Sequence, residues 1–297
     1  MQSSLNMDAR TVLVFGASGL LGSSLCPLLA RQGFRVLRQG RSVDAEVCCD
    51  PCSETDVRNA MRATQPKIVI NLVAESNVDR CETEPARAFA GNVVAARLIA
   101  GATLACGSRP HLIHVSSDHV YSGPGPHREE QVDPVNVYAL TKLTGEIFAL
   151  DAGATVLRTN FHGRSRCTGR PSFTDWLSYS LGDSAPFTVF EDVRFSALHL
   201  ETLATLIGET AVKRNPGLYN LGTTDSISKA SFAARFAELL GLDTTHMRSG
   251  RVADHRLPAK RPTDMSMDVS RFETAFGIPL PTAVNELARA AADYRRP

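Results

Sequence analysis

Charge bias is absent from this sequence, and so is any long hydrophobic run. The 297 residues carry 32 Lys and Arg against 31 Asp and Glu, a formal net charge of +1. This balance gives no indication of binding to nucleic acid or to an anionic membrane. No uninterrupted apolar run approaches the ~20 residues of a membrane-spanning helix, and the N-terminus lacks the pattern of a signal peptide. We therefore expect neither a nucleic-acid partner nor a membrane partner.

Cysteine is present, but not in a pattern typical of disulfide frameworks. The seven cysteines are odd in number and irregularly spaced, which favours a cytoplasmic protein with reduced thiols. Cys48, Cys49 and Cys52 cluster, yet no second ligand pair follows at the spacing of a metal site. We expect no metal centre and interpret the cluster as a strand end and turn.

Short apolar runs alternate with helical patterns in the first half of the chain. Strands are expected at residues 11–15, 34–37, 47–49, 67–73, 111–115 and 155–158, and helices at 20–31, 85–106 and 135–150. Apolar strands separated by helices predict a parallel sheet that is covered on both faces. The predicted fold class is therefore α/β, with a doubly wound parallel sheet of the Rossmann type.

The pattern becomes less regular after about residue 160. Strands are expected at residues 187–190 and 217–220, helices at 199–213, 229–240 and 281–294, and a loop at 250–263. We interpret residues 1–163 as a dinucleotide-binding domain and 164–297 as a smaller mixed α/β substrate-binding domain, with some C-terminal segments returning to the first sheet. Arg251, Arg256 and Arg261 in the loop either bind a substrate diphosphate or are solvated charges.

Three glycines, Gly16, Gly19 and Gly22, follow the first expected strand and open the first helix. Glycine there permits a tight turn, lets the backbone approach a pyrophosphate and lets the helix pack close to the strand. The helix N-terminus adds unpaired N–H groups and a partial positive charge. The spacing is G-x-x-G-x-x-G, and a purely structural turn is the alternative, but the flanking elements favour dinucleotide binding. The loop residues expected at the cofactor are Gly16, Ser18, Gly19, Leu20, Leu21 and Gly22.

The end of the second expected strand carries arginine where NAD-binding proteins carry an acid. A carboxylate there would bind the hydroxyls of the adenine ribose, but this sequence has Arg38 and Arg41 and no carboxylate before Asp44. Arginine suits bidentate contact with a phosphate. We expect NADP(H) as the preferred cofactor, with NAD(H) as an alternative. Solvated surface arginines are the competing interpretation.

Tyrosine and lysine are scarce, with five of each, yet Tyr138 and Lys142 stand four residues apart on an expected helix. Residues at this spacing share one helix face. The helix follows the fifth expected strand, and ligands bind at the carboxyl ends of such strands, where Ser117 stands. We expect Lys142 to lower the tyrosine pKa from ~10, so that Tyr138 serves as a general acid or base and Ser117 stabilises charge on the substrate oxygen. An ordinary exposed pair is the alternative.

These motifs together resemble the extended short-chain dehydrogenase/reductases. VLVFGASGLLG is similar to that family's first strand and glycine loop, HVSSDHVYSG and VYALTKLTGE to its catalytic strand and helix, and RPTDMSMDVSRFETAFGIPLP to its C-terminal signature. Over nearly the whole chain the sequence looks most like the dTDP-4-dehydrorhamnose reductase group. The resemblance implies NADP(H)-dependent reduction of the C4 keto group of a nucleotide-activated 4-keto-6-deoxy sugar.

The resemblance also implies roles for individual positions. The catalytic residues would be Ser117, Tyr138 and Lys142, of which Tyr138 and Lys142 also contact the cofactor. Further cofactor contacts would come from Asp50, Leu72, Val73, Ala74 and Asn92. Substrate contacts would come from Glu75, Asp118, Asn160, Phe161 and Arg194.

Departures from the family pattern leave the sugar nucleotide open. VFEDVRFSALHL replaces an Asp-Gln-x-Gly-Ser-Pro-Thr run, Glu75 interrupts an alanine-rich run, and Phe161 stands where tryptophan is common. A dehydratase would need Asp-Glu after the catalytic serine, whereas Asp118 is followed by His119. A sugar-nucleotide epimerase and a non-catalytic subunit resembling the regulatory subunit of methionine adenosyltransferase stay as alternatives. A homodimer is compatible with each reading.

Overall fold

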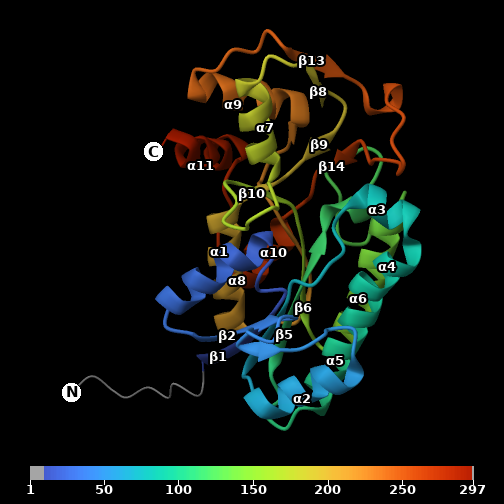
Figure 1. Ribbon diagram of the computed structural model, residues 1–297, viewed down its shortest axis with the longest axis vertical. Coiled ribbons are helices and arrows are strands. Elements are labelled where there is room, and N and C mark those ends of the chain that lie inside the picture. The colour runs from blue at the N-terminus through green and yellow to red at the C-terminus, as the bar shows by residue number, and fades with distance from the viewer. Residues whose placement is uncertain (1–9, 296–297) are drawn as a thin grey trace, which may run out of the picture.

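A seven-stranded parallel sheet forms the centre of the larger lobe in the computed structural model, which describes residues 10–295 (Figure 1). Each strand runs parallel to its neighbours. This sheet confirms the predicted doubly wound α/β fold. In spatial order the strands are β11 (Gly217–Leu221), β6 (Thr155–Thr159), β5 (His111–Ser117), β4 (Ile68–Asn71), β1 (Thr11–Phe15), β2 (Arg35–Gly40) and β3 (Val47–Cys48).

Helices cover both faces of this sheet because its side chains alternate between two apolar cores. Val12 and Val14 of β1 face one core, and Leu13 and Phe15 face the other. The first core is closed by α1 (Leu20–Arg31), α8 (Leu200–Lys213) and α10 (Ser270–Phe276). The second core is closed by α2 (Glu54–Thr64), α5 (Ala95–Ala105) and α6 (Val137–Asp151). Figure 1 shows the two helical layers on opposite sides of the strands.

A nearly continuous helical segment, Pro85–Ala105, leads along the second face. It comprises α4 (Pro85–Phe89), a π-helical turn (Ala90–Val94) and α5. Its 21 residues are long and apolar enough to cross a membrane, but 56% of the apolar window is buried inside the protein. It packs against α2, α6 and the sheet, so its apolar character is accounted for by core packing.

The smaller lobe is built around α7 (Phe173–Gly182), α9 (Lys229–Leu240) and α11 (Ala283–Arg295). Its core is rich in aromatic contacts, with the Phe232 ring packed against Phe195 and Phe236. The remaining strands are short: β7 (Phe161–His162), β8 (Phe187–Phe190), β9 (Arg194–Phe195), β10 (Leu198–His199), β12 (Ile227–Ser228), β13 (Met247–Gly250) and β14 (Asp264–Met265). They pair within three small sheets.

Most expected elements appear within a few residues of their predicted positions. The strand expected at residues 217–220 is β11, and it completes the edge of the large sheet beside β6. Helices α8 and α10 also pack on that sheet. The second half of the chain therefore contributes one strand and two helices to the larger lobe. The division of the chain into two domains at residue 163 stays a prediction.

Candidate active site

The glycine loop between β1 and α1 lies close to the end of the neighbouring strand, β4. Gly16 has φ 78°, a left-handed conformation that favours glycine. A Cβ atom on Gly16 would lie 3.0 Å from backbone atoms of Leu72 and Val73, and one on Gly22 would lie 2.5 Å from the carbonyl oxygen of Ala17. Side chains at these two positions would push the loop and α1 away from the sheet. The glycines therefore hold a backbone cradle of the kind that a dinucleotide pyrophosphate occupies.

The start of α1 is electrostatically prepared for an anion. Gly19 is the N-cap residue, no side chain caps the helix, and no acidic residue stands in the first turn. The first N–H groups of such a helix have no intrahelical partner and carry a partial positive charge. The buried Gln39 steadies the loop, since its Oε1 accepts from Gly16 N (2.9 Å) and its Nε2 donates to Cys49 O (2.6 Å). No motif in the sequence marks Gln39 for this role.

Two exposed arginines lie on and just after β2, the strand that pairs with β1. Arg38 lies at the end of β2, and Arg41 follows the strand. Arg38 Nε is 3.8 Å from Glu46 Oε2, a loose and exposed ion pair. Asp50 follows β3, and its Oδ1 accepts a hydrogen bond from Cys52 N (3.0 Å). Because both side chains are exposed, the two guanidinium groups are accessible to a phosphate. The phosphate-binding role predicted for Arg38 and Arg41 requires this accessibility.

Ser117, Tyr138 and Lys142 come together at the carboxyl end of β5. Ser117 is the last residue of that strand, and the other two stand on α6. All three side chains are buried, so Tyr138 and Lys142 are not an ordinary exposed pair. Lys142 Nζ donates to Val115 O (2.8 Å). Asn136 caps α6 by accepting from Ala139 N (2.8 Å), so that the helix begins at Val137, directly before Tyr138.

Burial decides the protonation of this pair. Desolvation raises the pKa of Tyr138 to about 12, although a hydrogen bond with Ser117 acts in the opposite direction. Desolvation lowers the pKa of Lys142 to about 8, and Glu146 partly offsets this shift. The expected lowering of the Tyr138 pKa by Lys142 is therefore wrong for the protein alone. Removal from water dominates both shifts, because each group loses the hydration of its charged form.

A second polar pair borders the same position. Asn160 Nδ2 donates to Asp118 Oδ2 (2.8 Å), and desolvation raises the pKa of Asp118 to about 7. The His119 ring meets the Tyr138 ring edge-on at 5.3 Å, and among residues 10–295 its buried Nδ1 has no hydrogen-bond partner. Phe161 follows Asn160 and is partly buried. In the sequence, His119 is marked only by its difference from the Asp-Glu of a dehydratase motif, which gives no indication of its contact with Tyr138.

Glu75 and Asn92 form a support behind these groups. The Glu75 carboxylate accepts from Arg80 Nη2 (2.7 Å) and Arg87 Nε (2.9 Å). Asn92 Oδ1 accepts from Glu75 N (2.9 Å), and its Nδ2 donates to Thr141 Oγ1 (2.9 Å). These bonds tie the loop after β4, where Leu72, Val73 and Ala74 lie partly buried, to α6. Direct contact of Glu75 with substrate or of Asn92 with cofactor stays a prediction, and the geometry gives both a positioning role.

Two other arginines considered in the sequence, Arg194 and Arg261, have partners within the protein. Arg194 lies on β9 of the smaller lobe and is bound to Ser226 through Nε (3.2 Å) and Nη2 (3.0 Å). Arg261 joins the lobes through an ion pair from its Nη2 to Asp79 Oδ2 (2.7 Å). Arg194 is not part of the polar cluster around Tyr138, whereas Arg261 is near enough to His119 that, after burial and Lys229, its charge lowers the pKa of that imidazole. Within residues 10–295, no group of three His, Cys, Asp or Glu side chains is arranged to hold a metal ion.

Comparisons with known proteins agree with this geometry. The profile of the family described as "RmlD substrate binding domain" matches residues 10–296. A probable low-salt glycan biosynthesis reductase of Haloferax volcanii is 30% identical, covering 95% of this chain and 97% of its own. A dTDP-4-dehydrorhamnose reductase of Streptomyces griseus is 32% identical over 89% of this chain and 87% of its own. The methionine adenosyltransferase 2 subunit beta of Xenopus laevis is 28% identical over 92% of this chain and 84% of its own.

A solved structure shows the same fold. The dTDP-4-dehydrorhamnose reductase of Bacillus anthracis, in complex with NADP, superposes with a TM-score of 0.87 at 20% identity, covering 96% of this chain and 99% of that chain. The family profile spans nearly the whole sequence, including the glycine loop and the Ser117, Tyr138 and Lys142 cluster. The chain therefore belongs to the RmlD family of sugar-nucleotide reductases, within the extended short-chain dehydrogenase/reductases.

Proposed function

We propose that this protein is an NADP(H)-dependent reductase of the C4 keto group of a nucleotide-activated 4-keto-6-deoxy sugar. The observation that carries the proposal is the meeting of Ser117, Tyr138 and Lys142 at the carboxyl end of β5, where all three are buried, in the same parallel sheet as β1 and its glycine loop. The names of the Streptomyces griseus relative and the Bacillus anthracis structure supply the reaction and the cofactor. We place the enzyme in the cytoplasm, and a homodimer stays a prediction.

The residues present suit NADPH. The glycine cradle and the start of α1 would hold the diphosphate, Arg38 and Arg41 would hold the 2′-phosphate, and Asp50 would approach the adenine. Leu72, Val73 and Ala74 would line the cofactor near its riboses. NADPH, when bound there, supplies the hydride for the C4 carbon.

The protein groups manage the proton of the reaction. Ser117 Oγ donates a hydrogen bond to the C4 oxygen and polarises the carbonyl. As the carbon–oxygen double bond becomes single, Tyr138 transfers its hydroxyl proton to that oxygen. The raised pKa of Tyr138 suits this direction, because the phenol is protonated at neutral pH and ready to act as an acid. The Lys142 ammonium steadies the phenolate that remains and holds the cofactor ribose.

The sugar lies in this proposal between the larger lobe and the loop that follows β6. Asn160 fixes the orientation of the Asp118 carboxyl, so that the pair can bind sugar hydroxyls. Phe161 packs against the sugar face. Glu75 orders the loop beside it through two arginines. The Arg194 side chain is bound to Ser226 on the smaller lobe. In this proposal Arg194 therefore contacts only the nucleotide end of the substrate.

The test begins with binding of NADPH and NADH to the wild type and the Tyr138→Phe variant, followed by turnover of dTDP-, UDP- and GDP-4-keto-6-deoxy sugars. We expect NADPH to bind both proteins equally and Tyr138→Phe to lower kcat by about 10²- to 10⁴-fold, the usual size of general acid catalysis. Tyr179→Phe is the matched control, because Tyr179 is 74% exposed and should leave both quantities unchanged. Full activity of Tyr138→Phe, or no turnover of any sugar by the wild type, would contradict the proposal.

A non-catalytic role is the second candidate. The relationship to the methionine adenosyltransferase 2 subunit beta favours it. In that case the cofactor site would bind NADPH without turnover, and the chain would form a complex with a methionine adenosyltransferase catalytic subunit. Co-elution of that complex, unaffected by Tyr138→Phe, would support this role in place of the reductase.

A further inference from the structure

A short segment of the second half of the chain crosses the glycine loop. Residues 164–171, here called the strap, connect β7 to α7. Cys167 Sγ donates to Ser18 O (3.1 Å), and a Cβ atom on Gly19 would lie 3.9 Å from Arg170 Nη1. In Figure 1 the yellow-green chain before α7 passes close to the start of α1. The strap therefore lies over the start of α1, where the cofactor diphosphate is proposed to bind.

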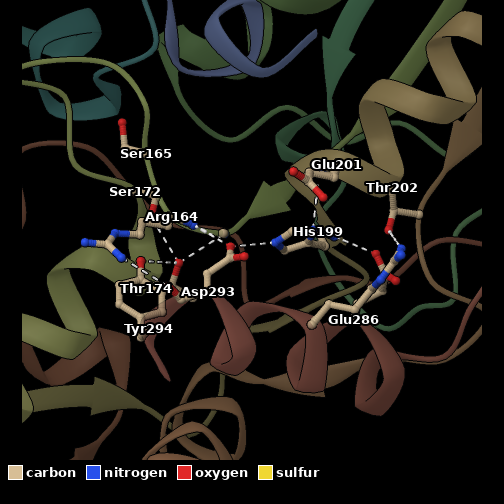
Figure 2. A network of polar contacts seen from close by, with 12 residues as sticks. Arg164, Ser165, Ser172, Thr174, His199, Glu201, Thr202, Glu286, Asp293 and Tyr294 are labelled. Atoms are coloured by element: carbon tan, nitrogen blue, oxygen red, sulfur yellow. Dashed lines mark hydrogen bonds and ion pairs between the residues drawn. The ribbon is translucent and has the colours of Figure 1, made fainter. Parts of the chain in front are cut away.

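The base of the strap is fixed by the polar network of Figure 2. Asp293 Oδ2 accepts from Arg164 N (3.2 Å) and pairs with His199 Nε2 (2.8 Å). Ser165 N donates to Asp175 Oδ2 (3.1 Å). Asp175 also completes the capping box with Ser172 that begins α7. The first two residues of the strap are thus bonded to α11 and to α7, and its other end leads into the capped start of α7, so its position over the loop is set by the fold.

The strap carries three arginines and no acidic residue. Arg164 Nη1 donates to Asp293 O (3.1 Å), and Arg166 Nη2 forms an ion pair with Glu201 Oε1 (2.8 Å). Arg170 differs: within the described part of the chain its backbone N–H is bonded to Cys167 O (3.3 Å), and its side chain forms neither an ion pair nor a hydrogen bond. One uncommitted guanidinium is therefore held beside an uncapped helix start that has no acidic residue in its first turn.

We infer that Arg170 binds the diphosphate of the cofactor from the side opposite the glycine loop. This inference rests on the proposed function. A guanidinium matches the geometry of phosphate oxygens through paired N–H donors, and the helix N-terminus attracts the same charge. The first half of the chain supplies the backbone cradle, and the second half supplies the side-chain cation.

Binding titrations of the full chain with three probes test the inference. We expect Arg170→Gln to weaken NADPH and ADP-ribose roughly tenfold, as for one partly exposed charge-assisted contact, and to leave 2′-AMP, which has no diphosphate, unchanged. The loss should shrink as salt rises. Arg170→Lys should restore part of the affinity, and Arg166→Gln, on the same strap, should bind all three probes like the wild type.

Three outcomes overturn the inference. Equal binding of ADP-ribose by Arg170→Gln and the wild type would show that Arg170 does not contact the diphosphate. Binding of NADPH by the wild type in the same experiment would leave the proposed function standing. Weakening of 2′-AMP alone assigns Arg170 to the other phosphate. Failure of the wild type to bind NADPH or NADH overturns the proposed function and this inference with it. Thermal unfolding of each variant, measured alongside, confirms that the strap variants are folded.

Discussion

Two glycines on neighbouring helices offer the same substitution with opposite expected results. Gly145 lies inside α6, where a Cβ atom would be 2.5 Å from the carbonyl oxygen of Asn92. Gly101 lies inside α5, where a Cβ atom would meet nothing within 4 Å. Asn92 belongs to the π-helical turn before α5, so at Gly145 the backbone of α6 lies directly against that turn. Alanine at Gly101 tests helix propensity, and alanine at Gly145 tests that approach.

The magnitudes follow from these distances. Gly101→Ala should stabilise the protein by about 0.5–1 kcal/mol, because alanine loses less backbone entropy in a helix. At Gly145 the same gain applies, but a carbon–oxygen contact needs about 3.3 Å, so α6 must move outward by roughly 0.8 Å. Such overpacking costs typically about 1–3 kcal/mol. We expect Gly145→Ala to be destabilised by about 1–2 kcal/mol after the helix gain is subtracted.

Urea unfolding and turnover measure the two effects separately. Because Tyr138 and Lys142 stand on α6, Gly145→Ala should also lower kcat, by as much as about 100-fold for a displacement near 1 Å. Gly101→Ala should keep full activity. Equal stabilisation of the two variants, or an unchanged kcat in Gly145→Ala, would refute the reasoning, since it would mean that α6 does not depend on the close approach at Asn92.

The remaining predictions concern buried charge. Glu146→Gln should cost about 3–5 kcal/mol in urea unfolding, because it leaves the buried Arg158 guanidinium without its carboxylate, whereas Glu238→Gln in an exposed pair should change stability by less than about 1 kcal/mol. Burial raises the pKa of Asp118 to about 7. The contribution of this group to stability is therefore full below its unfolded pKa of ~3.9 and falls by up to about 4 kcal/mol as pH rises through 7. Unfolding midpoints at pH 5 and pH 8 should therefore diverge in the wild type and not in Asp118→Asn. Burial lowers the pKa of Lys142 to about 8, so the kcat/KM of the reductase should decline above that pH as the ammonium loses its proton, and a flat profile to pH 10 would contradict this assignment.

The large sheet could be predicted from sequence because its signals are local. Each strand is a short apolar run, and Gly16 and Gly22 follow the first of them at a recognisable spacing. Tyr138 and Lys142 were found for the same reason, since four residues on a helix define a face. Helix α2 was missed, although Ser53 caps it through Asp56 N (3.3 Å) and marks its start.

The parts that escaped prediction depend on contacts between distant residues. Strands β9, β10, β12 and β14 have two residues each, too few to show a period, and form only where a partner strand is already placed. Gln39 and Arg170 carry no motif, and their positions beside the glycine loop follow from the complete fold. The direction of the Tyr138 pKa shift also depends on burial, which sequence spacing does not give.

The return of β11 to the large sheet has a consequence for synthesis of the protein. Residues 1–163 lack the edge strand Gly217–Leu221 and the helices α8 and α10 that cover one face. A nascent chain that has emerged only to residue 163 would expose Val12, Val14 and Ile113 to water, and such surfaces attract chaperones or other chains. The N-terminal half therefore stays incompletely folded until the segments between Leu200 and Phe276 have been synthesised, and the two lobes complete their folding together.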